Sequence, residues 1–195
     1  GAGMKLTDSR KLVSGVAATD VEYSWDGRLF ITDFGGGWKS HEEGRLLSLD
    51  AGATTWRARD AASTAKIMRD GFEQRSSAEL ANLLKHPDAR IRLRAQIALT
   101  RKPDALARFS EACDSSDFMV RVHAVWGLGI IARRGSSPLP ASDFAAVPSG
   151  KLRKEAEDKL VSLLKDKNEE IRCQVLRTLA DATTVKGQLP LGPLL

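Results

Sequence analysis

The residue types that most often carry out protein chemistry are sparse in this sequence and lie far apart. Its two cysteines, Cys113 and Cys173, belong to no CxxC pair and have no histidine spaced to share a metal with them. Such spacing provides no zinc cluster, disulfide framework or haem-attachment motif. Both cysteines occupy apolar positions of a repeated pattern described below, so we predict that both are buried as small hydrophobic side chains. We therefore expect no metal site and no cofactor.

Three polar groupings in the N-terminal third could in principle bind a ligand. The segment His41–Glu43 has metal-binding donors, but an exposed polar loop explains it more simply. The run Gly35–Gly37 lacks the lysine and the helix start of a phosphate-binding loop, so it predicts a flexible turn. Asp20, Asp26 and Asp33 carry the oxygens that calcium prefers, yet they fit turn and cap positions better. Nucleophile-elbow, zincin and EF-hand patterns do not occur, and we predict no catalytic residue.

A repeated pattern organises the rest of the sequence. Residues 80–99, 109–128 and 160–179 align without a gap. In each segment an apolar stripe ends, and an Asp or Asn follows four residues later. An Ile or Val comes three residues after that and is followed directly by an Arg. Asp and Asn cap helix N-termini, and the apolar residues that follow recur at i, i+4, i+7 and i+8, one face of a helix. The caps are Asp88, Asp117 and Asn168, and the arginines are Arg92, Arg121 and Arg172.

Each repeat predicts a pair of helices that cannot bury its apolar face alone, so the pairs must stack. We place the repeats at 78–101, 105–133 and 151–182, with an inserted Pro- and Ser-rich loop at 134–150. The pattern resembles short HEAT repeats. The resemblance implies a structural ladder in which Asp88, Asp117 and Asn168 pair with the three arginines, although Asn168 lacks the charge. The predicted fold is mainly α, a short α-α solenoid of HEAT-like repeats preceded by a small antiparallel β-meander.

A candidate contact surface follows from the same alignment. Arg94, His123 and Gln174 occupy one repeat position, two residues after the arginine. The HEAT resemblance implies that this column faces the concave side and could bind a partner; the alternative is a solvated surface. Trp126 lies on the same helix as His123 and would anchor a partner if it were exposed. Core packing is the alternative for Trp126.

The N-terminal segment has the alternation of a small sheet. Val21 and Tyr23 alternate with polar residues, Asp26 and Gly27 form a hairpin-turn signal, and Leu29–Phe34 and Gly44–Asp50 supply two further strands. We therefore place a three-stranded meander in residues 1–56 and the helical repeats in 57–195. The turn and second strand resemble one blade of a β-propeller, a fold that needs several blades to close.

The meander, together with segments Asp70–Ser76 and Leu83–Gln96, resembles the membrane-bound dehydrogenases of bacteria that are also described as haem-binding CxxCH proteins. The resemblance implies the last propeller blade and the middle HEAT repeats of a larger protein that is exported or periplasmic. The haem motif itself is missing from this sequence. Neither haem binding nor dehydrogenase activity therefore transfers to any residue here.

Charge and hydropathy narrow the possible functions. The formal net charge is +5, but 25 acidic residues are mixed with 30 basic ones. No apolar run approaches the roughly 20 residues that span a bilayer. Our leading hypothesis is a non-catalytic protein-interaction or spacer module within a larger exported redox protein. One alternative is a nucleic-acid-binding HEAT protein, and another is a tetrapyrrole lyase or chaperone-like HEAT protein. The basic face of the first alternative would consist of Arg90, Arg92, Arg94, Arg121 and His123.

Overall fold

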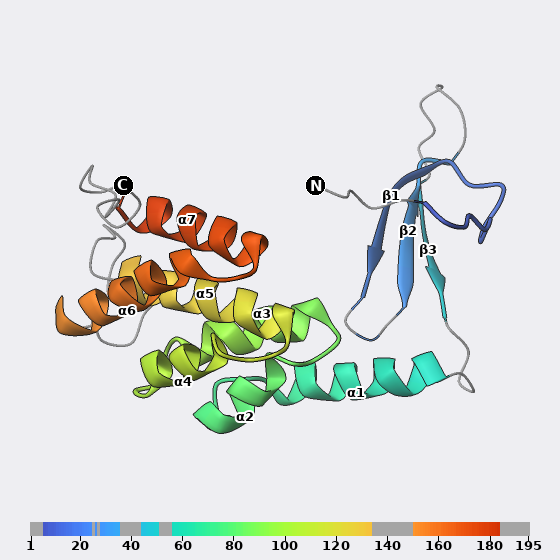
Figure 1. The fold of residues 1–195 in the computed structure, drawn as a ribbon. Helices are drawn as coiled ribbons and strands as arrows, with labels where there is room; N and C mark the ends of the chain where they lie inside the picture. Colours follow the sequence, from blue (N-terminus) through green and yellow to red (C-terminus); the bar gives the residue numbers. More distant parts are fainter. Residues whose placement is uncertain are drawn as a thin grey trace. The chain divides into compact units, whose positions relative to one another are not determined.

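The computed structural model describes residues 6–24, 26, 28–35, 44–50, 56–133 and 150–183. The chain consists of two compact units, residues 1–69 and residues 70–195. The first contains a small sheet and helix α1 (Trp56–Asp70), apart from its last residue, and the second contains the remaining helices (Figure 1). The division between the units therefore falls in the sequence at the C-terminal end of α1. The grouping His41–Glu43 and the inserted loop up to residue 149 lie outside the described residues.

The sheet is the antiparallel meander that the alternation predicts. Its strands are β1 (Ala18–Tyr23), β2 (Leu29–Asp33) and β3 (Arg45–Leu49), in the order β1-β2-β3. Val21 pairs with Ile31 and Ile31 with Leu47, so these apolar side chains share one face. A register shift interrupts the pairing between Ala18 and Asp20.

A buried carboxylate fixes the end of this sheet. Asp33 accepts hydrogen bonds from the backbone N–H groups of Ala17 (2.9 Å) and Gly35 (3.0 Å), and from Arg45 Nε (2.9 Å). The Gly35 hydrogen bond, with those of Ala17 and Arg45, holds the pKa of Asp33 below its ordinary value despite the opposing effect of burial. Asp33 therefore acts as a structural cap, as we preferred over the calcium alternative.

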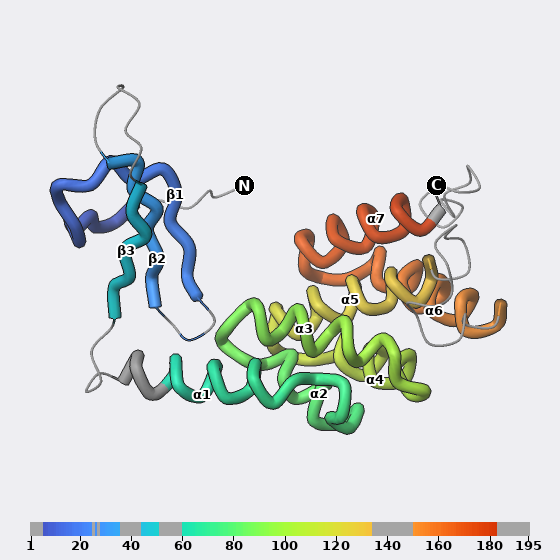
Figure 2. The backbone as a smooth tube through the Cα atoms, turned by 180° about the vertical axis from the view of Figure 1, so that it is seen from behind, coloured from blue at the N-terminus to red at the C-terminus, as the bar shows by residue number. Residues whose placement is uncertain are grey.

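The helices from residue 77 onward form three pairs. Their bounds are α2 (Ser77–Leu83), α3 (Ala89–Leu99), α4 (Ala105–Ala112), α5 (Phe118–Arg133), α6 (Gly150–Ser162) with the short 3₁₀ helix η2 (Leu163–Lys165), and α7 (Glu169–Thr183). Within pairs, α2 contacts α3, α4 contacts α5, and α6 contacts α7. Between pairs, α4 contacts both α2 and α6, while α5 contacts both α3 and α7 (Figure 2). The pairs therefore stack in two layers, α2-α4-α6 and α3-α5-α7.

Side-chain caps begin α2 and the second helix of each pair, the latter where the sequence predicts them. Ser76 and Glu79 form a capping box at α2. Asp88 accepts from Arg90 N (2.8 Å), Asp117 from Met119 N (2.8 Å) and Asn168 from Glu170 N (3.0 Å). Each of the second helices thus starts at an Asp or Asn that satisfies its first free N–H groups.

The aligned apolar positions form the interior of the stack. All are buried, with at most 7% of the residue exposed. They are Leu80, Phe109 and Leu160; Leu84, Cys113 and Leu164; Ile91, Val120 and Ile171; Ala95, Ala124 and Val175; and Leu99, Leu128 and Leu179. The alignment therefore identifies the core of this unit correctly.

The prediction for the cysteines holds for only one of them. Cys113 is buried, and burial raises the pKa of its thiol to about 12. Cys173 is exposed, so our prediction of a buried side chain was wrong there. Leu93 on α3 and Val122 on α5 occupy the same repeat position as Cys173. Leu93 is 47% exposed, so Val122 on the central helix is the only one of the three that is buried. The central helix differs because α5 alone contacts second helices on both sides.

Two glycines let α5 approach its neighbours closely. A Cβ atom added at Gly127 would overlap the Phe109 ring on α4, and one added at Gly129 would overlap Thr178 Cγ2 on α7. Helix α5 is apolar on nearly all sides, as expected for a helix enclosed by others. Close approach to α4 and α7 therefore requires the absence of side chains at these positions.

We expect Gly129→Ala to lower the free energy of unfolding measured in urea. Overpacking costs about 1–3 kcal/mol, which exceeds the gain in helix propensity of at most about 1 kcal/mol. Thr178 is short and β-branched, so it cannot turn away easily. In a Thr178→Ser background, which lacks the opposing methyl group, Gly129→Ala should be neutral or stabilising. Equal effects in both backgrounds would contradict this packing.

Candidate interaction site

A polar motif repeats in the turn of each helix pair. The side chain two residues before each cap accepts a hydrogen bond from the backbone N–H of that cap. The acceptors are His86 Nδ1 for Asp88 (3.0 Å), Ser115 Oγ for Asp117 (3.1 Å) and Asp166 Oδ1 for Asn168 (2.8 Å). Three different residue types thus perform the same task, which is why the aligned sequence did not reveal the motif.

The repeat arginines complete this motif by binding the turn from its other side. Arg92 Nη1 donates to the carbonyl of His86 (2.7 Å), Arg121 Nε to that of Cys113 (3.1 Å) and Arg172 Nη1 to that of Asp166 (2.8 Å). These carbonyls lie in the turn that follows the first helix of each pair, where helix carbonyls lack internal donors. Each arginine therefore joins the two helices of its own pair.

This arrangement corrects the predicted ladder. No side chain of Asp88, Asp117 or Asn168 bonds the side chain of the arginine of its own repeat; the Asp88 side chain instead pairs with Arg90 at 2.7 Å. The reason is directional, because the cap side chains point at N–H groups of their own helix while the arginines reach the preceding turn.

Between successive pairs, the repeat arginine Arg121 binds an acceptor other than the cap residues. Arg121 forms an ion pair with Asp166, and both side chains are nearly buried, at 12% and 11% exposed. Burial would raise the pKa of Asp166, but the hydrogen bond from Asn168 and the Arg121 guanidinium together lower it. Asp166 thus supplies the charge that Asn168 lacks. The signal available in the sequence was the position of Asp166 in the turn, two residues before the cap Asn168.

His123 lies inside the stack and does not contribute to an exposed column. It is 3% exposed, whereas Arg94 is exposed and Gln174 is half-buried. Arg92 Nε donates to His123 Nε2 at 3.2 Å, so Nδ1 carries the proton and donates to Gln96 Oε1 at 2.7 Å. Burial and the charge of Arg92 lower the pKa of His123 to about 4. The prediction that His123 offers a contact surface is therefore wrong.

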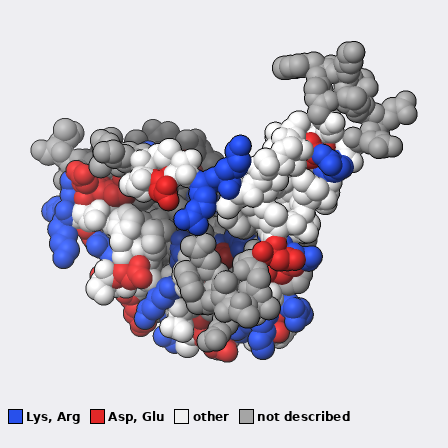
Figure 3. Space-filling model, turned by 90° about the vertical axis from the view of Figure 1, so that its right-hand side faces the viewer, with Lys and Arg blue, Asp and Glu red and all other residues white. Residues whose placement is uncertain are grey.

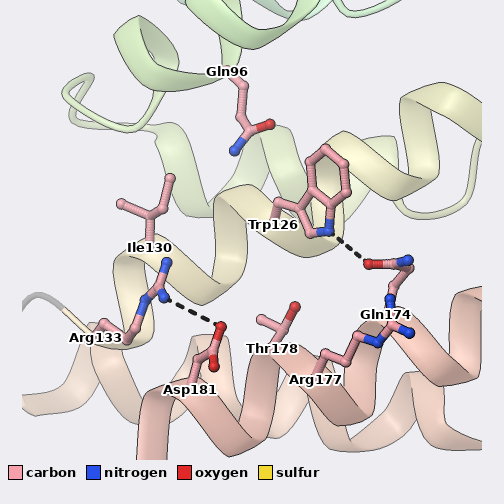
Figure 4. A pocket seen from close by; sticks show the side chains of 8 residues that line it. All are labelled: Gln96, Trp126, Ile130, Arg133, Gln174, Arg177, Thr178 and Asp181. Atoms are coloured by element: carbon pink, nitrogen blue, oxygen red, sulfur yellow. Dashed lines mark hydrogen bonds and ion pairs between the residues drawn. The ribbon is translucent and has the colours of Figure 1, made fainter.

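Trp126 lines a pocket on the α3-α5-α7 layer. Its Nε1–H donates to Gln174 Oε1 at 3.0 Å, which brings these two candidate residues together (Figure 4). The pocket has a volume of about 300 Å³, within the range of small-ligand sites. Its walls are Gln96 from α3; Trp126, Ile130 and Arg133 from α5; and Gln174, Arg177, Thr178 and Asp181 from α7. Gln96, Arg177 and Asp181 were not among the predicted site residues.

The side chains in this pocket could bind a ligand. Trp126 and Ile130 provide apolar surface, and amide and guanidinium groups provide hydrogen-bond donors. Among the residues that the structure describes, no group of three or more His, Cys, Asp or Glu could hold a metal ion. Within the same part of the chain, none of the helices has the length and apolarity to cross a membrane.

No family model, curated protein or solved structure matches the chain. The likeness to HEAT repeats and to the bacterial dehydrogenases therefore depends on the sequence patterns described above.

The buried neutral His123 predicts a pH dependence of stability. Unfolding restores a pKa near 6.5, so between pH 6.5 and 4 the unfolded chain binds a proton that the folded chain does not. The free energy of unfolding should therefore fall as the pH drops through this window, by about 2 kcal/mol between pH 7 and pH 5. In His123→Gln this dependence should be much weaker in urea titrations at the two pH values. An unchanged difference would show that His123 is not the group responsible.

Proposed function

We propose that this chain is a HEAT-like interaction module that binds a protein partner, or a neighbouring domain of a larger protein, through the layer α3-α5-α7. It has no catalytic role of its own in this proposal. The observation that carries it is the turn motif, which recurs in three helix pairs at the same position, with a different residue type in the same role each time. Stacked pairs of this kind present an extended surface built from equivalent helices.

The pocket at Trp126 supports binding through this layer rather than the opposite one. It is bordered by all three second helices, so a partner seated there would contact every repeat. A half-exposed tryptophan beside arginine is the combination that commonly anchors protein interfaces. Exposed apolar side chains on the same helices, Leu93, Ile97 and Leu176, extend the available surface.

The setting within a larger redox protein is part of the proposal. It is supported by the order of a small antiparallel sheet followed by helix pairs, which is the order implied by the resemblance to the bacterial dehydrogenases. In that setting the helices would act as a spacer or docking surface between exported redox domains.

Nucleic-acid binding is less well supported because its predicted basic residues are already engaged. Arg90 pairs with Asp88, Arg121 pairs with Asp166, and Arg92 binds the turn carbonyls and His123. His123 is neutral and buried, which leaves Arg94 as the exposed member of the five. On the face that Figure 3 shows, acidic and basic residues are interspersed. No feature of the described residues favours a tetrapyrrole ligand.

The proposal predicts that capture of a partner depends on this layer. With the chain immobilised, proteins retained from an extract of the native host should be lost with Arg177→Glu and with Trp126→Ala. The matched controls are Lys154→Glu and Leu152→Ala, which change the same kinds of group on exposed positions of α6. Retention of the same proteins by all four variants would contradict the proposal. So would oxidation of aldose or alcohol substrates by the purified chain with an electron acceptor, or retention of DNA that weakens steeply with salt.

A further inference from the structure

One wall of the Trp126 pocket contains a buried donor that has no acceptor among the described residues. Gln96 is 2% exposed, and its Oε1 is occupied by His123 Nδ1–H at 2.7 Å. Arg92 fixes that histidine tautomer from the other side, which in turn fixes the orientation of the Gln96 amide. Its NH₂ group is left over, and no described residue accepts from it. Buried donors without acceptors cost about 1–3 kcal/mol, so this group calls for an acceptor from outside the chain.

The charge in the pocket has the sign that suits an anionic acceptor. Arg133 and Asp181 face each other at 3.6 Å and largely offset one another. Arg177 is exposed, and none of the described residues forms a hydrogen bond or ion pair with it. One guanidinium charge is therefore available, and its planar fork matches the two oxygens of a carboxylate. Gln96 from α3 and Arg177 from α7 both line the pocket, and the Arg177 guanidinium lies beside Gln174 (Figure 4).

The Trp126 indole is fixed so that it offers apolar surface. Its only polar group donates to Gln174 Oε1, and Gln174 Nε2 donates in turn to Glu170 at 2.7 Å. The ring also packs edge-to-face on His123, with centroids 5.2 Å apart. The indole therefore has no donor left for a ligand, and with Ile130 it forms the apolar side of the pocket. Rings held in this way favour flat apolar groups.

From these features we infer that the pocket binds a carboxylate carried on a small apolar or aromatic group. The carboxylate would accept from the Gln96 NH₂ group, and the exposed Arg177 side chain would turn from Gln174 to pair with it. The apolar body of the ligand would lie against Trp126 and Ile130. This inference deepens the proposed function, and it rests on the proposed use of the α3-α5-α7 layer for binding. The carboxylate could belong to a free organic acid or to the C-terminus of a peptide partner.

Calorimetric titration with phenylacetate and with its neutral amide, phenylacetamide, tests the inference. The wild-type chain should bind one equivalent of phenylacetate and bind phenylacetamide at least about tenfold more weakly, as the loss of charged hydrogen bonds requires. Arg177→Gln, at an exposed position, and Gln96→Glu, which keeps the acceptor for His123 but replaces the donor, should each weaken phenylacetate binding to a similar degree. Arg108→Gln on α4 should leave it unchanged.

A second pair of probes distinguishes the two sources of the carboxylate. A short peptide ending in phenylalanine should bind more tightly than phenylacetate if the natural ligand is a peptide C-terminus, and its C-terminal amide should not bind. A peptide that binds more weakly than phenylacetate would assign the pocket to free acids. Either result supports carboxylate binding.

The inference is overturned if phenylacetamide binds as well as phenylacetate, if Arg177→Gln has no effect, or if no carboxylate binds at millimolar concentration. Its failure is separable from that of the proposed function. Partner capture that still depends on Arg177 and Trp126, without carboxylate binding, would remove only the inference. Carboxylate binding with partner capture that ignores both residues would remove only the proposed interaction module.

Discussion

Each helix pair of this protein is closed by an arginine on the second helix that donates to a carbonyl in the turn after the first. Arg92, Arg121 and Arg172 make this contact at 2.7, 3.1 and 2.8 Å. It satisfies acceptors that the first helix cannot satisfy itself, and it sets how the two helices of the pair meet. The guanidinium has donors to spare, so the same side chains also reach the next pair, where Arg92 binds His123 and Arg121 binds Asp166.

The candidate site depends on this constraint. Arg92 selects the His123 tautomer, His123 occupies the Gln96 oxygen, and Gln96 is left with its donor beside the pocket. On the other side, close packing of Gly129 against Thr178 brings α7 near enough for Gln174 to hold Trp126. The polar contacts that join the repeats and those that shape the pocket are therefore one connected network. A change in the network should alter stability and binding together.

Much of this fold could be predicted from the sequence because the relevant signals are local. The three strands follow from alternation, the second-helix starts from Asp88, Asp117 and Asn168, and the core from apolar residues that recur with helical spacing. These features depend on residues that are close in the chain, or on a pattern that repeats.

The site was less predictable because identical repeat positions have different surroundings. Arg94, His123 and Gln174 are equivalent in the alignment, yet only His123 is buried, since it lies on the central helix. Asp166 was missed because its partner, Arg121, lies in the preceding repeat. Gln96 shares its repeat position with apolar Val125 and Leu176, so nothing in the repeat pattern indicates a polar role for it. Side chains that meet across repeats require the three-dimensional arrangement to be known.

The most direct test of this account compares the free energies of unfolding of Arg121→Lys, Arg92→Lys and Arg172→Lys. Lysine keeps the charge but lacks the planar fork that presents separate N–H groups to two partners. We predict the largest loss, about 2–3 kcal/mol, for Arg121, which serves both a turn carbonyl and Asp166. The smallest loss should occur for Arg172, whose side chain forms a single hydrogen bond among the described residues, to the Asp166 carbonyl. If all three variants lost no more than the half-exposed Arg108→Lys, expected within about 0.5 kcal/mol of wild type, the arginines would not hold the helix pairs together.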